Sequence, residues 1–318
     1  MLRCALLFPG QASQYVGMGQ DLYAASQAAR AVFEEADEVL GFPLSTRCFQ
    51  GPEEDLRQTA VTQPAVFVHS MAAWRVLAQA GVEPLYLGGH SLGEYSALVA
   101  AGALDLRTGL ALVRRRGEAM QRSGDQCPGS MLAVLGLSDA QVEEVCGLAD
   151  CGGVVVPANY NAPGQVVISG ERHAVARAGE LARRAGAARV VELATSGAFH
   201  SPLMEPAAQE MAGVLREVRL SRARVPVVAN VSARLVQEPE EIRQSLIDQI
   251  TRPVLWTGSV QQLARLGVRT ALEVGPGAVL KGLVRRIARE VEVHLAGRAA
   301  EVEAALAALG LRAPSTAG

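Results

Sequence analysis

Ser91 has the spacing of a reactive serine, with Gly89 two residues before it and Gly93 two residues after it, as G-x-S-x-G. The apolar segment 85–89 predicts a short strand before the serine, and 92–102 predicts a helix after it. A serine on such a turn needs neighbours without side chains, so that the backbone can bend and the hydroxyl can project from the sheet edge. We therefore predict that Ser91 is a nucleophile. The alternative is a serine that only caps the helix.

The same turn supplies a second chemical group. The backbone N–H of Leu92 comes at the start of the helix, where N–H groups and the helix dipole stabilise negative charge. It would face the oxyanion that forms when Ser91 attacks a carbonyl carbon. Ser96 lies inside the predicted helix and is expected to be structural.

A serine hydroxyl needs a base, and the chain has five histidines. His200 lies in a loop of small residues, 196–204, that Pro202 closes. The other four are in less suitable places: an apolar helix (His69), the turn itself (His90), a charged helix start (His173) and a late strand (His294). Elimination therefore makes His200 the predicted general base.

No carboxylate stands out as the third member of a triad. Asp105, Asp125 and Asp139 fall between the serine and the histidine in chain order, but none has the strand-end position typical of a triad carboxylate. We expect a Ser–His pair whose histidine is oriented by a group other than a carboxylate.

Alternating strands and helices must position these residues. Residues 2–8 predict a buried first strand, and strand-like and helix-like segments then alternate up to about residue 126, which is typical of a parallel sheet covered by helices. Segment 127–197 has the order β-α-β-β-α-β of a ferredoxin-like module, and strand patterns then resume at 224–233 and 270–277. We predict an α/β fold: a large, discontinuous α/β-hydrolase-like domain with a parallel sheet (1–126 and 198–310), an inserted ferredoxin-like subdomain (127–197) and a disordered tail (311–318).

The composition narrows the class of protein. With 318 residues, 49% hydrophobic and 19% charged, the chain can bury a large core. Its net charge of −2 argues against a nucleic-acid or membrane partner attracted by bulk charge. The apolar run at the start of the chain is too short for a signal peptide, and no run reaches the length of a membrane span. Five cysteines without a C-x-x-C pair indicate neither disulfides nor zinc, and the expected location is the cytoplasm.

Five motifs then occur in a fixed order: LLFPGQASQYVGMG, GHSLGEYSALVAAGAL, RRRGEAMQ, NYNAPGQVVISG and GAFHSPLM. With them, the chain closely resembles the malonyl-CoA:acyl carrier protein transacylase family, which also supplies acyltransferase domains of polyketide synthases. The resemblance covers nearly the full length. It implies that Ser91 is the acylated nucleophile, that His200 is its base, and that Gln11 and Leu92 give the two oxyanion N–H groups. It also implies that a backbone carbonyl at Gln249 orients the histidine.

The resemblance further assigns Arg116 to the malonyl carboxylate. A planar guanidinium can hold a carboxylate through two hydrogen bonds, which a lysine cannot do. The alternative is that residues 114–116 form a solvated helix face, because all but one of the 30 basic residues are arginines. In related domains, a phenylalanine at the position of Phe199 accompanies malonyl rather than α-methylated units. Ala12 departs from the family, which commonly has glycine there.

The function implied by this resemblance is transfer of a malonyl group from malonyl-CoA to the phosphopantetheine thiol of acyl carrier protein, for fatty acid or polyketide synthesis. The implied enzyme is a monomer without metal or other cofactor, and coenzyme A enters only as the substrate thioester. Two alternatives stay open: a serine hydrolase of carrier-protein or acyl-CoA thioesters, and a carrier-binding protein without activity. The HGG-type oxyanion loop of esterases is absent from the sequence.

Overall fold

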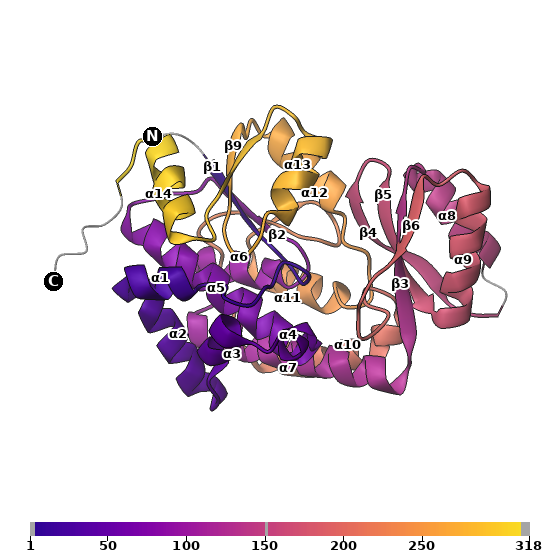
Figure 1. The fold of residues 1–318 in the computed structure, drawn as a ribbon, viewed down its shortest axis with the longest axis horizontal. Coiled ribbons are helices and arrows are strands. Elements are labelled where there is room, and N and C mark those ends of the chain that lie inside the picture. Colours follow the sequence, from indigo (N-terminus) through magenta and orange to yellow (C-terminus); the bar gives the residue numbers. More distant parts are fainter. Residues whose placement is uncertain (1–3, 150–151, 313–318) are drawn as a thin grey trace.

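In the computed structural model, which describes residues 4–149 and 152–312, the strands form two separate sheets (Figure 1). The chain before residue 127 forms β1 (Cys4–Phe8), α1 (Gln20–Ala25), α2 (Gln27–Leu40), α3 (Leu44–Gln50), α4 (Glu53–Arg57), α5 (Thr59–Gln79), β2 (Tyr86–Gly89), α6 (Gly93–Ala100) and α7 (Leu106–Gln126). The middle segment forms β3 (Gly129–Leu135), α8 (Asp139–Ala149), β4 (Val155–Ala162), β5 (Gln165–Glu171), α9 (Arg172–Arg184) and β6 (Arg189–Glu192). The last segment forms a 3-10 turn η1 (Pro202–Met204), α10 (Glu205–Glu217), β7 (Val227–Val228), β8 (Leu235–Val236), α11 (Pro239–Asp248), α12 (Trp256–Arg265), β9 (Thr270–Glu273), α13 (Val279–Ile287), β10 (Glu292–Leu295) and α14 (Ala299–Ala308).

The larger sheet has the strand order β10-β9-β1-β2-β7-β8. All its neighbours are parallel except β7 and β8. The central strand β1 is apolar and fully buried because helices cover both faces. Its side chains alternate between two cores, with Leu6 and Phe8 in one and Ala5 and Leu7 in the other. The predicted α/β fold with a parallel sheet is confirmed.

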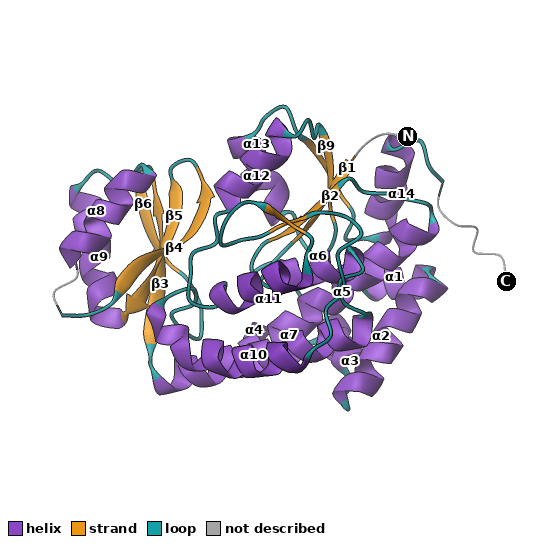
Figure 2. Cartoon of the chain, turned by 180° about the vertical axis from the view of Figure 1, so that it is seen from behind, coloured by secondary structure: helices purple, strands orange, loops and turns teal. Residues whose placement is uncertain are grey.

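The smaller sheet has the order β4-β5-β3-β6, and all its pairs are antiparallel. Helices α8 and α9 pack on its outer face, away from the larger sheet (Figures 1 and 2). On the inner face, Met131, Ala133 and Val167 join the core that the larger sheet shares. The two sheets therefore face each other across the middle of the molecule.

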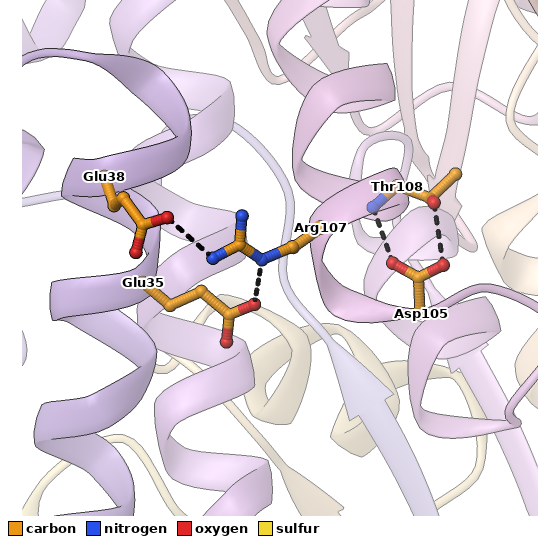
Figure 3. A network of polar contacts seen from close by, with 5 residues as sticks. All are labelled: Glu35, Glu38, Asp105, Arg107 and Thr108. Atoms are coloured by element: carbon orange, nitrogen blue, oxygen red, sulfur yellow. Dashed lines mark hydrogen bonds and ion pairs between the residues drawn. The ribbon is translucent and has the colours of Figure 1, made fainter.

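Helix α7 runs along the lower edge of the molecule in Figure 1 and reaches below β3 of the smaller sheet. Asp105 caps its first turn, since the carboxylate accepts hydrogen bonds from the N–H of Thr108 (2.8 Å) and from its hydroxyl (2.7 Å). Arg107, the second residue of the helix, forms ion pairs with Glu35 and Glu38 of α2 (Figure 3). These contacts fix the start of the helix that carries Arg116.

The strand predicted from segment 224–233 is shorter than expected. Only Val227 and Val228 pair with β2 and β8. Beyond them, the N–H of Asn230 donates to the Glu94 carboxylate and its C=O accepts from the N–H of Leu255. The strand pairing of β7 ends here because the backbone groups of Asn230 bond to Glu94 and Leu255 instead of to a neighbouring strand.

None of the helices within the described residues is both long and apolar enough to cross a membrane. In the same part of the chain, Cys4, Cys48, Cys127 and Cys146 are free thiols. The cytoplasmic location stays a prediction. The predicted tail falls mostly on residues 313–318, which lie outside the described residues.

Candidate active site

Ser91 occupies a tight turn between β2 and α6 and has a left-handed backbone with φ of 52°. Such a conformation costs a non-glycine residue about 1–3 kcal/mol. Gly89 and Gly93 serve a different need, the close approach of backbones. A Cβ on Gly93 would lie 2.2 Å from the carbonyl oxygen of Phe8, and one on Gly89 would lie 2.0 Å from the Gly93 carbonyl. The strained backbone conformation is therefore at Ser91, and the two glycines allow the neighbouring backbone segments to pack closely.

His200 lies beside this serine. The distance from its Nε2 to the Ser91 Oγ is 2.9 Å, and its Nδ1 lies 2.8 Å from the backbone oxygen of Gln249. A carbonyl oxygen only accepts, so Nδ1 carries the proton and Nε2 is free to accept from the serine hydroxyl. Burial, together with the charge of Arg116, lowers the pKa of His200 to about 3. The imidazole is therefore neutral at physiological pH.

Arg116 is buried, with an exposed fraction of 1%, and therefore does not lie on a solvated helix face. One guanidinium nitrogen donates to Gln63 Oε1 (2.7 Å). The other donates to Gln249 Oε1 (2.9 Å) and to Ser91 Oγ (3.1 Å). The preceding residue, Arg115, is exposed. Of the arginine triplet, only Arg116 touches the serine.

Gln11 comes to the same sheet edge as the serine turn because β1 and β2 are parallel neighbours, with Phe8 aligned to Gly89. Within residues 4–149 and 152–312, the backbone N–H groups of Gln11 and Leu92 donate to no protein acceptor, and both residues line the cleft described below. Ala12 has φ of 76°. This left-handed conformation favours glycine, which explains why a glycine would suit that position.

A cleft of about 250 Å³ opens at Ser91. Its polar end contains Ser91, His200 and Arg116, and Phe199, Met131 and further apolar side chains form its wall. The other lining residues are Gly10, Gln11, Ala12, Ser13, Gln63, His90, Leu92, Met120, Ala133, Asn159, Asn161, Gln165, Val167, Leu193, Thr195, Val279, Leu280 and Leu283. The walls come from the smaller sheet, from α5, α7 and α13, and from the loops that follow β1 and β2 in the larger sheet. An acyl chain could enter along the apolar wall and place its carbonyl carbon at the serine.

The comparisons with known proteins agree with this geometry. Residues 5–309 match the family model described as "Acyl transferase domain". The chain belongs to the acyl transferase family. It is 42% identical to the malonyl CoA-acyl carrier protein transacylase of Bacillus subtilis, over 97% of this chain and 98% of that one. With the Escherichia coli K12 protein of the same name it shares 43% identity, over 98% and 100% of the two chains.

Solved structures of acyl transferases have the same fold. A malonyl-transacylase in complex with a type II polyketide acyl-carrier protein superposes with a TM-score of 0.94 at 42% identity, covering 96% of this chain and 99% of that one. The acyl-carrier-protein-S-malonyltransferase of Bartonella henselae also gives 0.94, at 44% identity, covering 98% and 100%. The resemblance drawn from the sequence motifs is confirmed at the level of the family.

Three residues that hold the site of this acyl transferase together are not predicted from the sequence: Gln63, Asn230 and Glu94. Gln63 binds the Arg116 guanidinium, and Asn230 and Glu94 support the serine turn. Gln249 is predicted for its backbone carbonyl only, and its side chain also binds Arg116. Glu94 is 1% exposed, and burial raises its pKa to about 7. A charged residue in the otherwise apolar helix α6 was the one signal in the sequence.

The histidines and the serine that were set aside as catalytic candidates lie away from the Ser91 hydroxyl or have structural contacts. His90 contacts Asn161 Oδ1 (2.8 Å), whereas His69 is buried and contacts the Gly297 carbonyl (2.6 Å). Ser96 is buried inside α6. Among the described residues, only His200 of the histidines hydrogen bonds to Ser91, and no carboxylate orients it.

Proposed function

We propose that this chain moves a malonyl group from malonyl-CoA to the phosphopantetheine thiol of acyl carrier protein through a malonyl ester of Ser91. The names of its relatives, at 42–43% identity over nearly the whole chain, support this reaction. The observation that carries the proposal is the buried guanidinium of Arg116, 3.1 Å from the Ser91 hydroxyl. A cation beside the nucleophile suits an acyl group that bears its own carboxylate.

In the first half-reaction, Ser91 Oγ attacks the thioester carbon of malonyl-CoA and its proton passes to His200 Nε2. The backbone N–H groups of Gln11 and Leu92 hold the oxyanion of the tetrahedral intermediate. The C–S bond then breaks, and the leaving thiolate of coenzyme A takes the proton from His200. The Gln249 carbonyl keeps the imidazole in the required tautomer and stabilises its protonated form.

The second half-reaction runs the same steps in reverse. His200 takes the proton of the carrier thiol, the sulfur attacks the malonyl-serine carbonyl, and the Ser91 oxygen leaves with that proton. Arg116 would keep the malonyl carboxylate in place between the two steps. Ping-pong kinetics follow from the shared acyl-enzyme. These steps use the chain's own residues, so the expectations of no metal and no cofactor accompany the proposal.

We propose that Phe199 gives the enzyme a preference for malonyl over α-methylated acyl units. Its ring is 6% exposed and lines the cleft directly before His200 in the chain. A methyl group on the α-carbon of the acyl unit would crowd this ring.

We also propose the predicted division of the chain, with residues 1–126 and 198–310 as an α/β-hydrolase-like domain and 127–197 as a ferredoxin-like subdomain. The nucleophile's place between a parallel strand and a helix supports the first. The β-α-β-β-α-β order and the placement of α8 and α9 on one face of the antiparallel sheet support the second. We expect the enzyme to act as a monomer, away from membranes and nucleic acid.

Intact-mass measurement after mixing with malonyl-CoA tests the reaction. The wild type should gain one malonyl group, and Ser91→Ala should gain none. Acyl carrier protein should then remove the group and carry it away as malonyl thioester. Release mainly as free malonate would instead indicate a thioester hydrolase, and no labelling would favour a carrier-binding protein without activity.

A further inference from the structure

Asn230 lies next to the serine turn although 139 residues separate it from Ser91 in the chain. Strand β7 is parallel to β2, with Val228 aligned to Gly88. The segment that leaves β7 therefore passes beside the turn that leaves β2. Asn230 is 1% exposed and does not line the cleft.

The side-chain amide of Asn230 bridges the turn. Its Oδ1 accepts a hydrogen bond from the backbone N–H of Ser91 (2.7 Å), and its Nδ2 donates to the carbonyl oxygen of Gly89 (2.7 Å). The bridge thus holds the backbone that leads into the residue with the left-handed conformation. A primary amide suits this task because it offers a donor and an acceptor side by side, whereas an ionised aspartate offers only acceptors and a leucine neither.

The backbone of Asn230 is itself held in place by Glu94. Its backbone N–H donates to Glu94 Oε2 (3.2 Å). The same carboxylate oxygen accepts from Gln249 Nε2 (2.6 Å). Because the Gln249 carbonyl holds His200, the residue that supports the nucleophile and the residue that supports the base meet at one buried oxygen atom.

We propose that Asn230 is a positioning residue for acyl transfer: its amide holds the Ser91 backbone in the left-handed conformation that places Oγ within hydrogen-bond distance of His200. It acts through the backbone of Ser91 and does not contact the acyl group, which the cleft and Arg116 would hold. The inference rests on the proposed function of Ser91 as the acylated nucleophile.

Two variants of similar shape test the bridge. Asn230→Leu removes both hydrogen bonds, and Asn230→Asp keeps an acceptor for the Ser91 N–H but loses the donor to Gly89. The rate constant for malonyl-Ser91 formation is measured by rapid quenching and intact mass. It should fall about 100-fold in the leucine variant and less in the aspartate variant. The KM for malonyl-CoA should stay within about twofold, because the cleft is unchanged.

The amplitude of labelling separates positioning from folding. A slow but complete reaction, one malonyl group per chain, supports the proposal. Loss of amplitude at an unchanged rate would show only an unfolded fraction and would overturn it. So would wild-type rates in soluble Asn230 variants.

Gln237→Leu is the matched control. Gln237 follows β8, and its amide also donates to a backbone carbonyl, that of Ala223 (2.9 Å), without contacting the serine turn. This variant should acylate at the wild-type rate, and an equal slowing would overturn the special role of Asn230.

A second probe distinguishes failure of this inference from failure of the proposed function. If the wild type takes up no malonyl group, the proposed function fails. The bridge is then tested with an alkyl fluorophosphonate, whose phosphorus is attacked by a serine oxygen with loss of fluoride. Slower modification of Ser91 in Asn230→Leu supports the inference, and equal rates overturn it.

Discussion

Arg116 is buried, yet its three hydrogen-bond partners are neutral: the side-chain oxygens of Gln63 and Gln249 and the hydroxyl of Ser91. A buried charge normally needs an opposite charge or several good hydrogen bonds. The Glu94 carboxylate compensates this charge only indirectly, because it is linked to the guanidinium through the side chain of Gln249. An anionic acyl group would add the carboxylate that the site lacks.

Replacement of Arg116 by alanine should therefore change the selectivity of the enzyme. We expect acylation of Ser91 by malonyl-CoA to fall roughly 100-fold more than acylation by acetyl-CoA, because two charge-assisted hydrogen bonds of about 1.5 kcal/mol or more each are lost. Intact-mass time courses with both thioesters measure the ratio. Arg115→Ala is the control, since the exposed neighbour should leave the ratio unchanged. Equal losses for both thioesters would remove Arg116 from its proposed role.

At this scale the sequence predicts the residues whose chemistry is unusual and misses those that only support them. Ser91 is predicted from its glycines and His200 by elimination, and the structure brings the two together. Asn230 and Gln63 carry no local pattern, because their role depends on strands and helices that meet only in the fold. Glu94 has a weak signal as a charge in an apolar helix.

Among the elements, α7 matters most for the site. Its first turn lies at the surface, and its middle places Arg116 in the buried site. Its first turn contains two kinds of polar contact (Figure 3). Asp105 caps the helix through hydrogen bonds within one turn, and Arg107 forms ion pairs with Glu35 and Glu38. The arginine side chain is 54% exposed, so solvent screens those pairs.

The cap should therefore matter more than the ion pairs. Asp105→Ala should lower the free energy of unfolding by about 1 kcal/mol, whereas Arg107→Ala should lower it by less than about 0.5 kcal/mol. Urea unfolding followed by circular dichroism measures both changes. A larger loss for the arginine variant would contradict this ranking.

Two glycines give opposite expectations for the same substitution. A methyl group at Gly93 would meet the backbone of Phe8, at the end of β1, and of Pro9, so Gly93→Ala should destabilise the turn and abolish acylation of Ser91. Gly213 is exposed in the middle of α10, and beyond its chain neighbours and the backbone of its own helix a methyl group there would meet no atom within 4 Å, so Gly213→Ala should add about 0.5–1 kcal/mol of stability. Thermal unfolding and the malonyl-labelling assay compare the two. Equal effects would show that the backbone contact at Gly93 is unimportant.

Strands and helices with strong patterns are predicted better than short ones. The first strand and the β2–turn–α6 unit lie where the sequence places them. The two-residue strands β7 and β8 cannot be delimited from the sequence, because β7 ends through long-range contacts to Glu94 and Leu255. Hydrophobic patterns report burial but not the partner of each backbone group.

For the whole molecule, buried histidines make stability depend on pH. His69 is fully buried, and burial lowers its pKa to about 4 from the ordinary 6.5. As the pH falls, the unfolded chain therefore takes up the proton first, and the histidine's contribution to stability is lost from about pH 6.5 toward pH 4. Glu94 and Glu273 act in the opposite direction, since burial raises the pKa of each to about 7.

A variant isolates the histidine from these opposing groups. Between pH 7.5 and 5, the free energy of unfolding of the wild type should fall by about 2 kcal/mol more than that of His69→Gln. Glutamine can still donate to the Gly297 carbonyl but does not titrate. Urea unfolding at the two pH values gives the difference, and identical pH dependence in both proteins would rule out His69 as the source.

The central position of β1 has a consequence for the order of folding. Residues 4–8 pair with residues 86–89 and with residues 270–273, so one neighbour of the first strand is synthesised long after the strand itself. The strands of the smaller sheet, in contrast, all come from residues 129–192. Contacts between residues so close in sequence form quickly. During synthesis, the inserted unit can therefore assemble on the ribosome before β9 has been made, and one edge of the apolar first strand stays without its partner until then.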